Sequence, residues 1–110
     1  MKNSNLIRSS SQYSKGIEGY VYDGIDGSQM AYWTCKKAGI SEPHKHPYDE
    51  YMVVISGKYT VTMKRKKYPL GKGDEILIKK GVMHGGFRTA NTRTIHVFGG
   101  KRAERAKERA

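Results

Sequence analysis

Short runs of alternating hydrophobic and polar residues, separated by glycine-containing turns, make up most of this chain. Residues 58–64 are the clearest case, because Tyr59, Val61 and Met63 alternate there with lysine and threonine. Further short strands are predicted within 16–24 and over 29–37, 50–55, 75–79 and 93–98. Short strands without a long helical pattern predict an all-β domain, either a β-barrel or a β-sandwich.

The segments between these strands are interpreted as connections. Residues 38–43 contain glycine, serine and proline and are predicted to form a loop that leads to His44. Residues 65–67 are predicted to form a turn, followed by Tyr68-Pro69-Leu70. Residues 82–84 follow a turn at Lys80-Gly81.

The two ends differ from the middle of the chain and define three parts. Residues 1–15 are rich in serine and asparagine and are predicted to be an arm that is either flexible or lies along an edge of the domain. Residues 16–100 are predicted to be the single β-barrel domain. Residues 101–110 form a charged tail of strong helix formers, which is too short for a stable isolated helix and therefore docks or frays.

Composition restricts the setting of this 110-residue chain. Its longest apolar run has five residues, far below the roughly 20 that a membrane-spanning helix needs, so no membrane association is expected. The N-terminus lacks the apolar core of a secretion signal. Cys35 is the only cysteine and is interpreted as a small buried side chain, which fits a reducing, cytoplasmic location.

A net charge of +11 raises the question of nucleic-acid binding. The basic residues are spread over predicted turns and the tail, and no helix-turn-helix, zinc-finger pattern or aromatic platform accompanies them. Such a distribution is typical of solvated surface or of steering toward an anionic partner, so nucleic-acid binding is not expected. A weaker alternative is a basic scaffold whose C-terminal tail binds an acidic partner.

The stretch His44-Lys45-His46-Pro47-Tyr48-Asp49-Glu50 carries the strongest candidate chemistry. Side chains two residues apart on an extended strand point to the same side, so His44 and His46 project together. Glu50 opens the next apolar run and could add a carboxylate. Nitrogen and oxygen donors of this kind suit divalent iron, manganese, nickel, zinc or copper. The alternative is that the two histidines are polar residues of an exposed loop and that Glu50 is an exposed charge at a strand edge.

With His84 added, the sequence resembles the cupin superfamily over roughly residues 17–98. The first cupin motif, Gly-x5-His-x-His-x3,4-Glu-x6-Gly, is matched by His44, His46, Glu50 and Gly57, although Gly39 is one residue closer to the first histidine. The second motif, Gly-x5-Pro-x-Gly-x2-His-x3-Asn, is matched by Gly73, Gly81 and His84. Lys79 replaces its proline and Arg88 its asparagine.

The resemblance implies a cupin β-barrel, the jelly roll or double-stranded β-helix, that holds one divalent transition metal. His44, His46, Glu50 and His84 are the implied metal ligands, which leave coordination positions open for water or substrate. Small cupins often form homodimers by pairing sheet edges, so a homodimer is expected as well.

The candidate residues outside the ligand set are predicted to shape a binding cavity. Alternation places Thr94, His96 and Phe98 on one face of the last strand. If that face points inward, His96 is a candidate general acid or base; otherwise Ile95 and Val97 fill the core. The last strand is similar to that of small cupins that process unsaturated sugar acids, which implies a substrate-binding role for Arg102.

Two further residues complete the predicted substrate site. Met52 shares the face of Glu50 and is expected inside the barrel, whereas Tyr48 lines the pocket or covers the barrel rim. The orientation of Tyr32 and Trp33 is left open, because a shift of one residue in register reverses it.

These observations lead to three functional hypotheses. The first is a metal-dependent enzyme that isomerises or tautomerises a small oxygenated, anionic metabolite such as a sugar acid. The second is a cupin dioxygenase that uses iron or copper. The third is a non-catalytic module that binds a metabolite or a metal, for which His96 would face outward.

Overall fold

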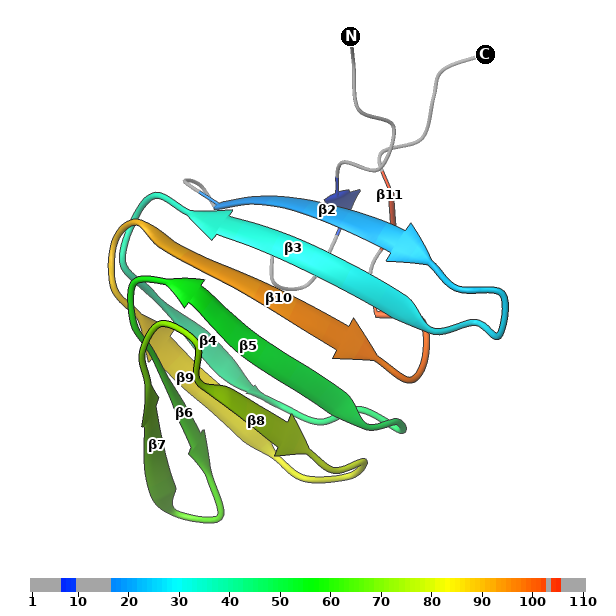
Figure 1. Cartoon of the computed structure of the whole chain (residues 1–110). Coiled ribbons are helices and arrows are strands. Elements are labelled where there is room, and N and C mark those ends of the chain that lie inside the picture. The colour runs from blue at the N-terminus through cyan, green and yellow to red at the C-terminus, as the bar shows by residue number, and fades with distance from the viewer. Residues whose placement is uncertain (1–6, 10–16, 103, 106–110) are drawn as a thin grey trace, which may run out of the picture.

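The structure, a computed structural model, describes residues 7–9, 17–102 and 104–105, and its described part is made of antiparallel β-sheets. One sheet has five strands in the order β2 (Ile17–Asp23), β3 (Gln29–Cys35), β10 (Thr92–Phe98), β5 (Glu50–Ser56) and β8 (Glu75–Ile78). A second sheet has the order β4 (Gly39–His44), β9 (His84–Arg88), β6 (Tyr59–Met63) and β7 (Lys66–Leu70). The two sheets face each other as a jelly roll, which confirms the predicted fold class (Figure 1).

The space between the two sheets is filled by alternate side chains of their strands. β5 shows the pattern, since Glu50, Met52 and Val54 are buried whereas Tyr51 and Ile55 are exposed. One apolar cluster lies along the inner faces of β2 and β3 and includes the end of β10, and another joins inward residues of β5, β6, β7 and β8. Because strand side chains alternate between faces, each strand needs only every second position to be apolar.

The loop prediction for residues 38–43 was wrong, because Gly39–His44 form β4. Pro43 lacks an amide hydrogen and signals a loop in a sequence. β4 is an edge strand, and its register with β9 shifts between Ser41 and His44, so the missing donor is tolerated there. β9 itself was not predicted as a strand, because its sequence His-Gly-Gly-Phe-Arg has little β propensity.

The turn predicted at 65–67 lies slightly earlier. Lys64 and Arg65 both have positive φ angles, 50° and 62°, and they connect β6 to β7. Two consecutive positive φ values are typical of the two-residue hairpin turns that usually contain asparagine or glycine. A lysine–arginine pair gives no such signal, so the sequence placed the turn one residue or two too late.

Parts of the predicted arm and tail lie side by side. β1 (Ile7–Ser9) pairs with β11 (Glu104–Arg105) in a separate two-stranded sheet beside β2 (Figure 1). The other residues of the arm and tail, 1–6, 10–16, 103 and 106–110, are outside the described part of the chain. Across the described part, no helix has the length and apolar character that a membrane crossing requires.

Candidate metal centre

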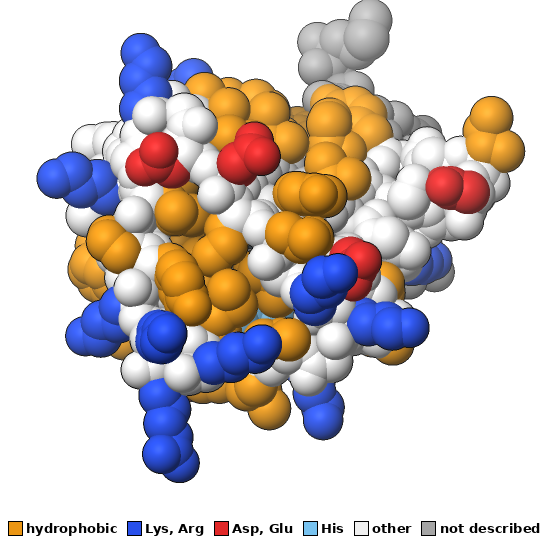
Figure 2. All heavy atoms as spheres, turned by 60° about the horizontal axis from the view of Figure 1, so that its bottom comes forward, with side chains coloured by type: hydrophobic (Ala, Val, Ile, Leu, Met, Phe, Trp, Pro, Cys, Tyr) orange, Lys and Arg blue, Asp and Glu red, His pale blue; other side chains and the backbone are white. Residues whose placement is uncertain are grey.

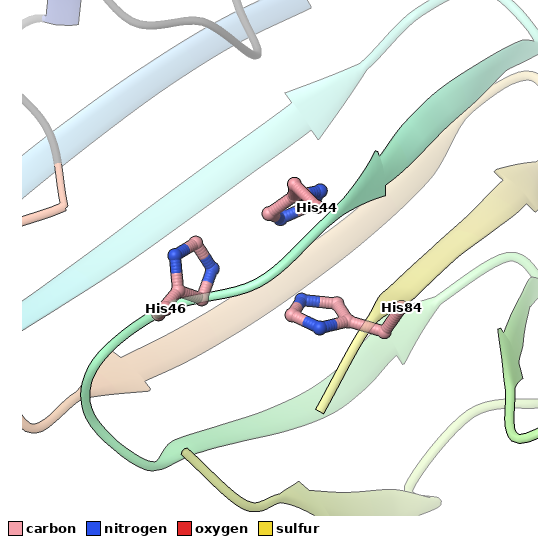
Figure 3. Close-up of side chains that lie close together, drawn as sticks. All are labelled: His44, His46 and His84. Carbon is pink, nitrogen blue, oxygen red and sulfur yellow. The ribbon is translucent and has the colours of Figure 1, made fainter. Parts of the chain in front are cut away.

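Three histidines converge between the two sheets (Figure 3). His44 ends β4 and His84 begins β9, and their Cα positions are paired in the sheet. His46 follows in the connection to β5, where its ring stacks on that of Tyr48 at a centroid distance of 5.0 Å. One ligand nitrogen from each histidine lies within 4.8 Å of the others, so the three are close enough to bind one metal ion.

Backbone carbonyls orient two of the three imidazoles. Nδ1 of His44 lies 2.8 Å from the carbonyl oxygen of Glu42, and Nδ1 of His84 lies 2.9 Å from that of Val82. A carbonyl oxygen can only accept, so each Nδ1 carries the hydrogen and donates it. In the neutral rings the lone pair is therefore on Nε2, which is the arrangement that a metal-binding histidine needs.

Glu50 adds a carboxylate to the cluster. Its Oε1 lies 3.3 Å from Nε2 of His46 and 3.4 Å from Nε2 of His84. These three atoms are buried, and no described residue forms a hydrogen bond of good geometry with any of them. Buried polar atoms without partners are costly, and a bound divalent cation would satisfy all three at once. The donor set therefore fits a metal ion.

His96 faces the interior and holds the other oxygen of Glu50. Its Nδ1 lies 2.7 Å from Oε2 of Glu50, and its Nε2 lies 3.0 Å from Oγ1 of Thr94. The side chain of His96 is only 12% exposed. Because a carboxylate can only accept, Nδ1 donates to Glu50, and in the neutral ring Nε2 accepts from the Thr94 hydroxyl. His96 thereby fixes the carboxylate that points at the histidine cluster.

The electrostatics of the site favour an ionised carboxylate. Burial alone would raise the pKa of Glu50, but His46, His84 and His96 lower it far below its ordinary range. Burial lowers the pKa of His44, which favours the neutral ring. Burial also acts to lower the pKa of His84, but the Glu50 carboxylate and the Val82 carbonyl raise it overall. A raised pKa favours protonation of His84, so a cation that binds Nε2 of His84 would compete with a proton for that nitrogen.

A cavity of about 50 Å³ adjoins the cluster, which is room for more than one water molecule. Met52 and His96 line it. Alternation along β5 predicted this position for Met52, whereas alternation along β10 left the direction of His96 open. Arg102 also lines it, and its backbone amide donates to Oε1 of Gln29 at 2.6 Å. Tyr48 does not line the cavity; it packs on His46, and its hydroxyl donates to the carbonyl oxygen of Lys101.

The sequence left the orientation or the role of several cavity residues open. Trp33 points inward and Tyr32 outward, an orientation that pairing of β3 with β10 decides. Thr94 shares the inward face of His96, and alternation did indicate it, but no role was assigned to it. Arg88 and Tyr59 face each other across β9 and β6, and the sequence marked Arg88 only as a departure from a motif.

Residues 31–98 match the cupin domain family, and the chain therefore belongs to the cupins. This finding confirms the resemblance drawn from the two histidine motifs. No curated protein matches the chain.

Solved structures of cupins share the fold. KdgF from Halomonas sp. is 20% identical with a TM-score of 0.74, and the match covers 92% of this chain and 96% of that protein. An RmlC-like cupin from Shewanella frigidimarina is 16% identical with a TM-score of 0.74, covering 89% and 96%. An oxalate decarboxylase variant from Bacillus subtilis is 20% identical with a TM-score of 0.69, covering 89% of this chain but 30% of that one. Identities this low show the fold alone.

Proposed function

We propose that this cupin is a metal-dependent enzyme that isomerises or tautomerises a small, oxygenated, anionic metabolite of the sugar-acid type. The observation that carries the proposal is the chain of contacts from the three-histidine cluster through Glu50 to His96 and Thr94, all beside one cavity. It combines a place for a cation with a titratable group next to the space for a substrate.

His44, His46, Glu50 and His84 would hold the metal. The fit rests on the Nε2 lone pairs of His44 and His84 and on the buried oxygen of Glu50 that has no hydrogen-bond partner in the described chain. A divalent cation bound there would act as a Lewis acid that polarises a substrate oxygen. Iron, manganese, nickel, zinc and copper all accept such a mixed nitrogen and oxygen donor set.

His96 and Thr94 would move the proton that an isomerisation requires. The neutral His96 ring accepts from the Thr94 hydroxyl at Nε2, so the hydroxyl can pass its proton to Nε2 while it takes one from the substrate. The imidazolium formed in this way is stabilised by Glu50, 2.7 Å from Nδ1. The reverse transfer returns the proton to another carbon or oxygen of the substrate.

Arg102 is proposed to bind the anionic substrate. It lines the cavity. Burial lowers the pKa of its guanidinium, and the electrostatic effects of Tyr48 and Glu50, which raise that pKa, offset only part of the shift. Apart from Glu50, no acidic side chain lines the cavity within the described residues. On the face seen in Figure 2, lysine and arginine side chains lie beside and below the apolar centre, with acidic side chains in the upper part, and the more numerous basic groups would also attract an anion.

The position of His96 favours an enzyme over the non-catalytic binding module. That module requires His96 to point outward and the cavity to contain no base beside the cluster. In the structure His96 points inward and contacts Glu50. The dioxygenase alternative uses the same ligands and differs only in the metal and the co-substrate, so the experiment below separates the two.

A homodimer and a cytoplasmic location are further parts of the proposal. The outer face of the five-stranded sheet carries a row of register-paired, exposed apolar side chains, Tyr22, Met30, Val97 and Tyr51, which supports burial against a second copy. The one cysteine, Cys35, is buried and free, which is compatible with a reducing compartment.

Metal analysis by mass spectrometry on untagged protein tests the proposal. We expect about one equivalent of a transition metal in the wild type, retention in Glu75→Ala at an exposed position of β8, and loss in His46→Ala and Glu50→Ala. The metal-loaded protein is then assayed for exchange of carbon-bound hydrogen of sugar acids in D₂O by NMR. His96→Asn, which keeps a donor for Glu50 but cannot accept a proton, should bind metal and abolish exchange.

Three results would contradict this proposal in different ways. If neither the wild type nor the variants contain metal and all are folded, the enzyme proposal fails and the non-catalytic binding module is supported. Oxygen consumption with an iron- or copper-loaded protein, without isomerisation, supports the dioxygenase. Full exchange activity in His96→Asn removes His96 from the reaction.

A further inference from the structure

Arg88 is a buried cation that the proposed metal chemistry does not use. It ends β9, is only 8% exposed and lines the same cavity as the histidines. Its Nε is buried without a hydrogen-bond partner, and no ion pair of Arg88 exists within the described residues. Among the residues that the structure does not describe, 1–6 and 10–16 contain no aspartate or glutamate, and 106–110 contain one, Glu108. A buried, unpaired charge is strongly unfavourable unless a ligand compensates it.

The neighbours of Arg88 are neutral and polar. Tyr59 is its partner in register on β6, and the hydroxyl of Tyr59 is hydrogen-bonded to Ser41 on β4. Burial raises the pKa of Tyr59, with Ser41 and Arg88 opposing, so the phenol stays protonated at neutral pH. Burial likewise raises the pKa of Cys35, and Arg88 opposes that shift. Neither group supplies a negative charge to Arg88.

Glycine 39 provides the space for the guanidinium. Gly39 is the register partner of Arg88 on β4, and a β-carbon added at Gly39 would come within 2.6 Å of Nη2 of Arg88. This position is also the glycine of the first histidine motif that is displaced by one residue. Gly39 and Arg88 therefore belong to one local arrangement, in which a missing side chain on one strand admits a long cationic side chain from the next.

Tyr59 links this arrangement to the metal centre. Its ring occupies the space where a side chain at Gly86 would lie, between His84 and Arg88 on β9. The charges of both Arg88 and Glu50 act on its hydroxyl. Arg88 follows His84 by four residues, about 13 Å along the strand, and both side chains extend into the cavity between them. A molecule that spans the two is a few carbon atoms long.

We propose that Arg88, with the hydroxyl groups of Tyr59 and Ser41, forms a carboxylate-binding subsite that fixes the end of the substrate remote from the metal. This inference rests on the proposed function for the identity of the reacting end, but the subsite itself requires no metal. A carboxylate matches the fork of guanidinium donors, accepts from a phenol and neutralises the buried charge. The substrate class is thus narrowed to small acids whose carboxylate is separated from the oxygen that meets the metal.

The experiment uses the full chain after dialysis against EDTA, so that the result is independent of the metal centre. Trp33, the only tryptophan, lines the cavity and reports binding by fluorescence. The probes are propionate, its neutral analogue propionamide, and methylphosphonate. We expect saturable binding of propionate, weaker binding of the other two, and a loss of about 10-fold to 100-fold in propionate affinity in Arg88→Gln. Arg93→Gln removes the same charge from an exposed position on β10 and should change nothing.

Two further variants distinguish a ligand-binding role from a structural one. Gly39→Ala keeps the charge but displaces the guanidinium, so propionate affinity should fall while the protein stays folded. Arg88→Met removes the uncompensated charge, so the melting temperature of the ligand-free protein should rise.

The outcomes that overturn the subsite are specific. They are equal binding of propionate and propionamide, unchanged propionate affinity in Arg88→Gln, a lower melting temperature in Arg88→Met, or a preference for methylphosphonate. Metal content measured on Arg88→Gln remains at the wild-type value if only the subsite is disturbed. Failure of the subsite and failure of the metal centre are therefore separate results.

Discussion

The hydrogen bond between His96 and Glu50 gives the sharpest quantitative prediction. In His96→Phe a ring of similar shape replaces the imidazole, and stacking on Phe98, now at a centroid distance of 5.8 Å, is preserved. The substitution removes the donor that lies 2.7 Å from Oε2 of Glu50. The Glu50 side chain is only 5% exposed, so water cannot readily replace that donor.

The magnitude follows from the charge and burial of the acceptor. A hydrogen bond to a charged group contributes about 1.5–3 kcal/mol. Loss of an outer-shell partner of a metal ligand typically weakens metal affinity by about 10-fold to 100-fold, which corresponds to about 1.4–2.8 kcal/mol. The two figures agree, and we expect His96→Phe to weaken binding of Zn²⁺ or Ni²⁺ by a factor in this range.

Competition with a chromogenic chelator at fixed pH measures that affinity. His96→Asn is the matched variant, because its amide can place a donor near the position of Nδ1 and should recover most of the loss. Circular dichroism establishes that both variants are folded. The reasoning is refuted if His96→Phe binds metal within twofold of wild type, or if His96→Asn loses as much affinity as His96→Phe.

Two further predictions concern stability. Gly57 and Gly27 have similar positive φ angles, 81° and 86°, but a β-carbon at Gly57 would collide with Thr92 whereas Gly27 has open space. Gly57→Ala should therefore destabilise the protein by about 1–3 kcal/mol more than Gly27→Ala in urea unfolding, and equal losses would contradict the contact. The pKa of Glu50 is lower in the folded protein than its ordinary value of 4.5, so its ionised form stabilises the fold at pH values above 4.5. This stabilisation is lost progressively as the pH falls below 4.5. Melting temperatures of the metal-free protein between pH 6 and about 3 should fall more steeply than those of Glu50→Gln; parallel curves would show that Glu50 has no such role.

The sequence predicted the fold class because its information is local and periodic. Alternation over 58–64 and in β5 fixes which side chains face the core, whatever the partner strand is. Prediction from hydrophobic alternation failed for strands whose pairing with other strands overrides the low β propensity of their own residues. β4 contains a proline and β9 two glycines. β4 is a strand because it pairs with β9 around His44 and His84, and β9 is held by β4 on one side and β6 on the other.

The candidate site divides in the same way. The match of His44, His46, Glu50 and His84 to the two cupin motifs is a sequence property, and that resemblance implied that these residues would meet. The direction of His96 was an open alternative, because a register shift of one residue would reverse it. Pairing of β10 with both β3 and β5 decided it by placing His96 beside Met52 and within reach of Glu50.

By itself, then, the sequence determined an all-β domain, because strand periodicity is local, and it indicated four candidate metal ligands through their resemblance to the cupin motifs. Only the tertiary structure decided that Arg88 is buried without a counter-ion among the described residues and shares a cavity with His44, Glu50 and His84. Burial and charge pairing depend on residues brought together from β3, β4, β6 and β9. No local sequence pattern indicates which of the 21 lysine and arginine residues is buried in the cavity.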